Sequence, residues 1–397
     1  MTTMPLAPLC NLLRLRTPDI VVSPAATYDF AGVKSFGGGV FRGPSKAGSQ
    51  FSYRRLSRIR SGKFIYPKLM AWEGALGIVP GNLDGLFVSP EFCVFDVDRD
   101  AADPRWIDYY FRQASVWPRL SSGSSGTNIR RRRIYPADFL KHQVPLPPLA
   151  EQRRIVAKIE RLAGLVEEAK GLNFATCQGA STLGQAAIDR LFTAVAKRVG
   201  VTRLGELEPH VTSGPRNWSQ HQSETGERFY RAQDIGPDGR TLDGSRLFIT
   251  PPNGQQGRIA HLEPGDLMIV ITGATVGRVA LFSDSHESGF VSQHVAICRL
   301  PQSRVLPEYG LYCLRSPQGR GQLLGQRYGQ GKPGLNLTNI RNIAIPIPSF
   351  DEQERVLGRA RAVEARLGAI LREEQNVRAE IDAMVPAILD RAFKGDL

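Results

Sequence analysis

Two stretches of the chain place apolar residues at alternating steps of four and three positions. The stretches are residues 151–194 and 352–385, and the second repeats the first at a constant offset of 201. This alternation is the heptad pattern of a helix that packs along another helix. It predicts two long helices whose seams are formed by Ile155, Ile159, Leu162 and Val166 in the first and by Val356, Val363, Leu367 and Ile370 in the second.

Each predicted helix follows a proline-rich phrase. Residues 144–155 read VPLPPLAEQRRI and residues 345–356 read IPIPSFDEQERV. Proline fixes its own φ and disfavours helix at the residue before it, so each phrase predicts a stiff entry into the helix. Asn173 and Glu374 interrupt the two seams at equivalent positions, and either an exposed kink or a polar layer that sets the register explains them.

The repeat also predicts how the helices meet. Equivalent seams in a pseudo-twofold chain favour an antiparallel pair, with Ile155 near Ile388 and Leu191 near Val356. Asn173 and Glu374 would then approach one another at the middle of the pair.

The segments between the helices are rich in short strands. The runs FVSPEFCVFDV, DLMIVIT, VGRVALF and HVAICRL have strand-like composition, and DPRWIDYYFRQ and LPEYGLYCLRS each predict a short helix. The phrase VSPEFCVF at 88 recurs as VSQHVAIC at 291. We therefore predict an α+β chain with a pseudo-twofold internal repeat: a first domain over 1–143, a helix over 144–200, a second domain over 201–344 and a helix over 345–397.

Charge points to a polyanionic partner. The 397 residues carry a net charge of +13, with +9 in residues 1–143, +3 in 144–200, +3 in 201–344 and −2 in 345–397. A positive field attracts phosphate, so DNA, RNA and an anionic membrane surface are all candidate partners. The first inter-helix segment carries most of the excess charge.

Cysteine usage and apolar runs limit the compartment. The five cysteines are odd in number and include no C-x-x-C pair, which favours a reducing compartment, most simply the cytoplasm. Neither a signal peptide nor a membrane anchor is expected, because no apolar run is long and continuous enough.

The sequence shows no arrangement typical of an enzyme. TGATVG at 272–277 lacks the Lys-Ser/Thr of a phosphate loop and predicts a tight turn between strands. FGGG at 36–39 lacks the partner motif of a methyl-donor site, and the six histidines show no metal-ligand spacing. We predict that the chain alone catalyses no reaction.

Basic residues predict where a nucleic acid would bind. The run Arg130, Arg131, Arg132, Arg133 adjoins the flexible stretch SSGSSGTN, although a solvated charged edge is the alternative interpretation. Aromatic residues among these positions are more often core, so the basic side chains carry the prediction. The remaining candidates are Arg42, Lys46, Arg54, Arg55 and Lys68 in the first segment and Arg327, Tyr328 and Lys332 in the second.

Taken together, the two phrases, the two helices and the motifs GVKSFGGGVFRGP, MAWEGALGIVPGNLDGLFVSPEF, FYRAQDI and GATVG resemble the specificity subunit of type I DNA restriction-modification enzymes. The resemblance covers essentially the whole chain. It implies two target recognition domains, each reading one half of a split, asymmetric double-stranded DNA target, separated by two antiparallel helices.

The resemblance also implies partners. Two modification subunits and, in the restriction complex, motor-nuclease subunits would dock on the repeated phrases, and S-adenosylmethionine, ATP and magnesium would belong to those partners. A pseudo-twofold body can present one docking surface twice to identical partners. The residues assigned to docking are Pro147, Glu151, Gln152 and Arg154 in the first phrase and Pro348, Glu352, Gln353 and Arg355 in the second.

Two alternatives remain open from the sequence. The chain could be a stand-alone sequence-specific DNA-binding protein, or it could serve a modification-only methyltransferase without cleavage. A fused methyltransferase ranks last, because the methyl-donor motif pair is missing.

Overall fold

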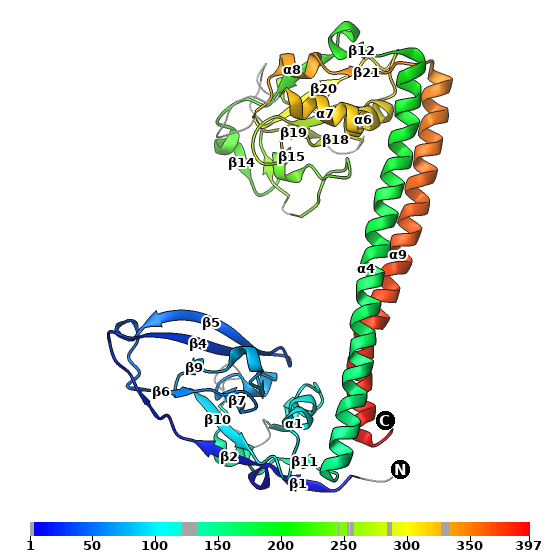
Figure 1. Ribbon diagram of the computed structural model, residues 1–397. Coiled ribbons are helices and arrows are strands. Elements are labelled where there is room, and N and C mark those ends of the chain that lie inside the picture. The colour runs from blue at the N-terminus through cyan, green and yellow to red at the C-terminus, as the bar shows by residue number, and fades with distance from the viewer. Residues whose placement is uncertain are drawn as a thin grey trace. The chain divides into compact units, whose positions relative to one another are not determined.

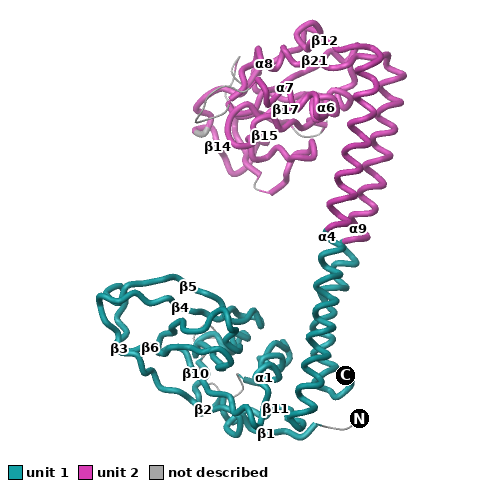
Figure 2. The backbone as a smooth tube through the Cα atoms, in the orientation of Figure 1, with its two compact units in different colours: residues 1–174, 375–397 teal, residues 175–374 magenta. Residues whose placement is uncertain are grey.

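The computed structural model describes residues 4–120, 133–244, 246–251, 254, 258–283, 288–326 and 334–397. The chain divides into two compact units (Figure 2). Unit 1 is Met1–Phe174 with Gln375–Leu397, and unit 2 is Ala175–Glu374. Both divisions fall inside long helices, so each unit combines one β-rich domain with a part of each helix.

Unit 1 contains three antiparallel or mixed sheets. Their strand orders are β1-β11, β2-β10-β7-β8 and β3-β6-β9-β4-β5. The strands are β1 Leu6–Pro8, β2 Leu13–Arg16, β3 Ile20–Val21, β4 Thr27–Lys34, β5 Gly39–Ala47, β6 Arg55–Arg58, β7 Phe64–Pro67, β8 Gly77–Ile78, β9 Phe87–Val88, β10 Phe92–Val97 and β11 Gln143–Pro145.

Aromatic side chains fill the main core of unit 1. Helices α1 (Pro104–Phe111), α2 (Trp117–Leu120) and α3 (Pro136–Phe139) contribute to this core, and Phe64 stacks on Phe139 with ring centroids 5.6 Å apart. Helix α1 begins where the sequence provides a cap: Asp103 accepts a hydrogen bond from the backbone of Arg105, and Pro104 occupies the first turn.

Unit 2 repeats this plan. Its sheets have the orders β12-β21, β13-β20-β17-β18 and β14-β16-β15-β19, and its helices include α6 (Pro307–Arg315), α7 (Pro317–Gly325) and α8 (Leu337–Arg341). The strands are β12 Thr202–Arg203, β13 His210–Ser213, β14 Gln222–Ser223, β15 Glu227–Tyr230, β16 Phe248–Ile249, β17 Leu267–Val270, β18 Val279–Leu281, β19 Gly289–Val291, β20 Val295–Arg299 and β21 Ala344–Ile345.

The four-stranded sheets of the two units share one register. Val94 pairs with Ile65 between β10 and β7, and adding 203 to both gives Ile297 paired with Met268 between β20 and β17. The internal repeat predicted from the sequence is therefore present down to individual strand pairs. The predicted boundaries at 143/144 and 344/345 fall within β11 and β21, which pair with β1 and β12 to close each domain.

The two long helices are α4 (Leu149–Val199) and α9 (Phe350–Lys394), each beginning one or two residues after the last proline of its phrase (Figure 1). Helix α4 is continuous, as predicted. Helix α9 continues through Pro386, past the end of the proline-free stretch, and Leu389 and Ala392 beyond it remain buried. Packing of this apolar end keeps the helix together despite the lost backbone N–H.

The predicted seams hold near the helix starts and fail farther along. Ile155, Ile159, Val166 and Val356 are buried, and Leu162, Val363 and Leu367 are partly buried. Ile370 is 45% exposed, so this seam assignment was wrong. A straight helix has 3.6 residues per turn and drifts about 20° per heptad, which moves the buried stripe by one position.

Within each unit the helices run antiparallel, as predicted. In unit 1, Ile155 and Ile388 share an apolar cluster, and Lys170 pairs with Asp382 at 3.2 Å. In unit 2, Leu191 and Val356 share a cluster. The approach of Asn173 to Glu374 stays a prediction.

Among the described residues, no helix is both long and apolar enough to cross a membrane. The turn predicted at 272–277 does join β17 to β18, closed by a hydrogen bond from Gly277 N–H to the Val270 carbonyl at 2.9 Å.

Candidate nucleic-acid interface

Three segments of unit 1 meet where strand β7 ends. The Lys68 N–H donates to the Glu91 carbonyl at 2.9 Å, and the Ile134 N–H donates to the Lys68 carbonyl at 2.9 Å. A turn closed by the Phe92 N–H and the Ser89 carbonyl at 3.0 Å presents residues 89–91 beside them. We call residues 68, 89–91, 133 and 134 the unit 1 turn site.

Charged side chains converge at this site. Arg133 pairs with Glu91 at 3.1 Å while both side chains remain more than two-fifths exposed. The Lys68 ammonium donates a hydrogen bond to the Pro90 carbonyl at 2.9 Å. The structure thus brings together Lys68 and Arg133, which the sequence predicted separately; Arg130, Arg131 and Arg132 lie outside the described residues.

Unit 2 builds the same backbone arrangement at the end of β17. The Ile271 N–H donates to the His294 carbonyl at 2.9 Å, the Leu335 N–H to the Ile271 carbonyl at 2.8 Å, and the Val295 N–H to the Ser292 carbonyl at 2.9 Å. Each bond repeats its unit 1 counterpart at an offset of 201 or 203. We call residues 271, 292–294, 334 and 335 the unit 2 turn site.

The side chains of the two turn sites differ. Ile271 replaces Lys68, His294 replaces Glu91 and Gly334 replaces Arg133. Gln293 and His294 are exposed, with their side-chain nitrogens 3.2 Å apart. Amide, imidazole, carboxylate and guanidinium groups can all hydrogen-bond to base edges, and each favours different bases. Arg327, Tyr328 and Lys332, predicted for this region, lie outside the described residues.

The other basic candidates of unit 1 lie on or beside the five-stranded sheet. Arg42 and Lys46 are exposed on the edge strand β5, where Arg42 contacts Asp29 at 3.4 Å. Arg54 and Arg55 are exposed at the start of β6. The sheet that carries these four residues is therefore a different one from the sheet whose strand ends at Lys68. Three aromatic residues near these positions, Phe36, Phe41 and Tyr53, are 74%, 38% and 40% exposed.

The docking assignment needs correction at four residues. Gln152 and Gln353 have no exposed surface, and Pro147 and Pro348 are buried. Because all four side chains are buried, they offer no surface to a partner. The two glutamine side chains are instead hydrogen-bonded to backbone atoms of their own unit. Arg154 and Arg355 are exposed and Glu151 is partly exposed, whereas Glu352 is mostly covered and pairs with Arg198.

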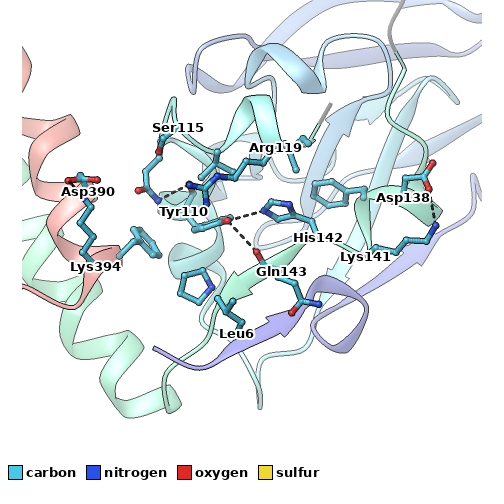
Figure 3. A pocket seen from close by; sticks show the side chains of 16 residues that line it. Leu6, Tyr110, Ser115, Arg119, Asp138, Lys141, His142, Gln143, Asp390 and Lys394 are labelled. Carbon is cyan, nitrogen blue, oxygen red and sulfur yellow. Dashed lines mark hydrogen bonds and ion pairs between the residues drawn. The ribbon is translucent and has the colours of Figure 1, made fainter. Parts of the chain in front are cut away.

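A cavity of about 700 Å³ lies beside α1, α3 and the end of α9 in unit 1 (Figure 3). In it Tyr110 and His142 point toward each other, with the hydroxyl 2.9 Å from Nε2. Burial, and then the charge of Arg119, lowers the pKa of His142, which favours the neutral imidazole. The equivalent cavity of unit 2, about 280 Å³, places Ile345, Pro346 and Cys313 along its wall.

The described residues include no group of three or more His, Cys, Asp or Glu side chains placed to hold a metal. Sequence reasoning did not select Glu91, Gln293 and His294, which the structure adds to the candidate interface residues. The signal was present in the repeated phrase VSPEFCVF and VSQHVAIC, since a repeat whose apolar frame is kept but whose polar residues differ marks a surface turn.

Comparisons with known proteins agree with this architecture. Residues 253–375 match the family model of the type I restriction modification DNA specificity domain. The chain is 20% identical over 366 residues to the type I restriction enzyme EcoBI specificity subunit of Escherichia coli, covering 86% of this chain and 76% of that relative.

Solved structures share the fold over the whole chain. A chain from a structural study of complex assembly and conformational transition of the type I R-M system superposes with a TM-score of 0.69 at 23% identity, covering 100% of this chain and 99% of that one. The HsdS subunit from Thermoanaerobacter tengcongensis gives 0.57 at 24% identity, covering 100% and 98%. The chain is therefore similar in sequence to type I restriction enzyme specificity subunits, and it shares the fold of the HsdS subunit.

Proposed function

We propose that the chain selects a split double-stranded DNA target, with unit 1 reading one half-site and unit 2 the other through their turn sites. The observation that carries the proposal is the repeated backbone frame with different exposed side chains. Because the two turn sites share the same backbone hydrogen bonds, their side chains occupy equivalent positions. Side chains that differ in chemistry at these positions then favour different bases. The positive charge of residues 1–143 supports binding of DNA phosphates by that part of the chain.

We also propose partners for the chain. Modification subunits carrying S-adenosylmethionine, and restriction subunits using ATP and magnesium, would assemble on it, as the family resemblance implies. Among the residues assigned to docking, the exposed Arg154 and Arg355 and the partly exposed Glu151 are the side chains open to such contacts. The chain itself would supply recognition, while methyl transfer and cleavage would belong to the partners.

The test is to express the chain with modification subunits of its own system and map methylated sites in a host genome. We expect one bipartite motif. Glu91→Gln should then relax base preference in one half-site by about tenfold, and the double variant Gln293→Ala, His294→Ala should do so in the other half-site, the size of one good base contact.

Glu167→Gln provides a control, because this carboxylate is 68% exposed on α4 and distant in sequence from either turn site. A contiguous motif, or turn-site variants that relax both half-sites together, would contradict the proposal. If the restriction subunits are then added and bipartite methylation is kept without any cleavage, a modification-only system is favoured instead.

A further inference from the structure

In unit 1, one buried side chain connects the start of the long helix to the recognition domain. The Oε1 atom of Gln152 accepts a hydrogen bond from the Asp103 N–H at 3.0 Å. Its Nε2 donates to the Ala101 carbonyl at 3.1 Å and to the Pro147 carbonyl at 2.8 Å. Asp103 is the residue that caps helix α1, so Gln152 joins the beginnings of two helices and the proline phrase between the last strand and α4.

Unit 2 contains the same arrangement. Gln353 accepts from the Leu306 N–H at 2.9 Å and donates to the Arg304 carbonyl at 2.9 Å and the Pro348 carbonyl at 3.0 Å. Leu306 occupies the cap position of α6. We call Gln152 and Gln353 the glutamine bridges. All their partners are backbone atoms, so the bridge survives although Asp103 and Ala101 become Leu306 and Arg304.

A second contact joins the same elements on the outside. In unit 1, Arg105 on α1 donates to both carboxylate oxygens of Glu160 on α4, at 3.1 and 3.2 Å. In unit 2, the equivalent of Arg105 is Glu308 and the equivalent of Glu160 is Arg361, and these two also form an ion pair. Both charges are reversed, and the pairing is kept.

We propose that in each unit the glutamine bridge and the ion pair between the two helices are positioning contacts. They fix the direction in which the recognition domain leaves its long helix. That direction in turn sets the number of base pairs accepted between the half-sites. Two contacts at separate points on one helix start resist rotation of the domain, which one contact would allow. The inference rests on the proposed function, because a gap exists only if the two units read two half-sites.

The first variants are Gln152→Glu and Gln353→Glu, which keep the side-chain size but remove the amide donor. Each leaves one buried and one partly buried carbonyl without its partner and places a carboxylate oxygen against them. Complexes with the modification subunits are offered duplexes with the native gap and with one base pair more or fewer. We expect the preference for the native gap to fall by about tenfold, with both half-site sequences still required.

The second series uses the exposed pair of unit 2, whose change leaves the core intact. Glu308→Arg and Arg361→Glu should each lower the gap preference about two- to fivefold, and the double variant should recover at least half of the loss. Unit 2 is chosen because Leu306 is uncharged there, whereas Asp103 also contacts Arg105 in unit 1. Recovery is incomplete because Glu354 lies 4.0 Å from Arg361.

A contact that merely supports folding would give a different result. Its loss would weaken binding to every duplex by the same factor, and that outcome, or an unchanged gap preference, overturns the inference. Failure of the double variant to recover also overturns it, and this series decides alone if the glutamine variants do not assemble. A wild-type complex with no bipartite preference would refute the proposed function instead.

Discussion

The two units differ at two kinds of position. Ion pairs inside each unit have their charges exchanged between the two members, whereas exposed turn-site residues change without such compensation. In unit 1, Lys63 just before β7 pairs with Asp96 on β10; at the equivalent positions of unit 2, Asp266 pairs with Arg299. As with Arg105–Glu160 and Glu308–Arg361, both members changed sign together. At the turn sites both members change without compensation: Arg133 and Glu91 form a pair, whereas the equivalent Gly334 and His294 do not replace it with another.

Paired reversal is what a contact within the protein requires, since changing one charge alone leaves the other facing a like charge. Uncompensated change is tolerated where the side chains are exposed and no internal contact has to be kept. By this criterion the turn sites are the positions free to vary, as the proposed reading of two different half-sites requires, while the ion pairs preserve a common frame.

The largest test of this contrast exchanges a whole domain. If the proposed function holds, replacing residues 201–344 by the equivalent segment of a similar specificity subunit should change one half-site completely and leave the other unchanged, because the exchanged segment contains the unit 2 turn site. Mapping of methylated sites measures both halves at once. A complex that still methylates but has changed in both halves would show that the units do not read independently.

A smaller effect should follow from removing the basic run that adjoins the unit 1 turn site. If Arg130, Arg131, Arg132 and Arg133 contact phosphates, replacing all four by alanine should make the negative slope of log K against log salt shallower by about three to four. Binding to specific and to random DNA should weaken by a similar factor. Lys332→Ala in unit 2 is the matched control and should lower the slope by at most about one. An unchanged slope would identify the run as a solvated charged edge.

The sequence predicted the repeat because its signals are local. Seam spacing, proline phrases and the strand-like runs depend on neighbouring residues, and they predicted both helices and the paired domains. The turn sites could not be predicted in the same way, because Lys68, Glu91 and Arg133 meet only through strand pairing. The role of Gln152 was misassigned for a related reason: burial of a polar side chain depends on what folds over it.

The ion pairs Asp266–Arg299 and Lys63–Asp96 should also contribute different amounts to the free energy of unfolding. Asp266 has no exposed surface and accepts from Arg299 at 2.7 and 2.8 Å, and also from the Glu263 N–H at 2.7 Å. Asp266→Asn should therefore destabilise unit 2 by about 3 kcal/mol, the cost of breaking a buried pair. Asp96 is 32% exposed, so Asp96→Asn should cost unit 1 about 1 kcal/mol or less. Urea unfolding followed by amide hydrogen exchange in each unit measures both, and equal losses would contradict the burial argument.

The smallest effect is a difference in acid sensitivity between the units. Burial, and then Arg119, lowers the pKa of His142, whereas Ile343 holds the equivalent position in unit 2. The unfolded chain then binds a proton more readily than the folded one, so this contribution to stability is complete above the unfolded pKa of about 6.5 and is lost as pH falls toward the lower folded value.

Acidification from pH 7 to 5 should therefore loosen unit 1 around His142 more than the equivalent part of unit 2, as measured by amide hydrogen exchange. The variant His142→Gln removes the titrating group but keeps an oxygen that can accept from the Tyr110 hydroxyl, which lies 2.9 Å from the imidazole. It should abolish most of this pH dependence at little cost in stability at pH 7. If the variant lost protection on acidification as steeply as the wild type, the acid sensitivity would arise elsewhere in unit 1, and the difference between His142 and Ile343 would have no part in it.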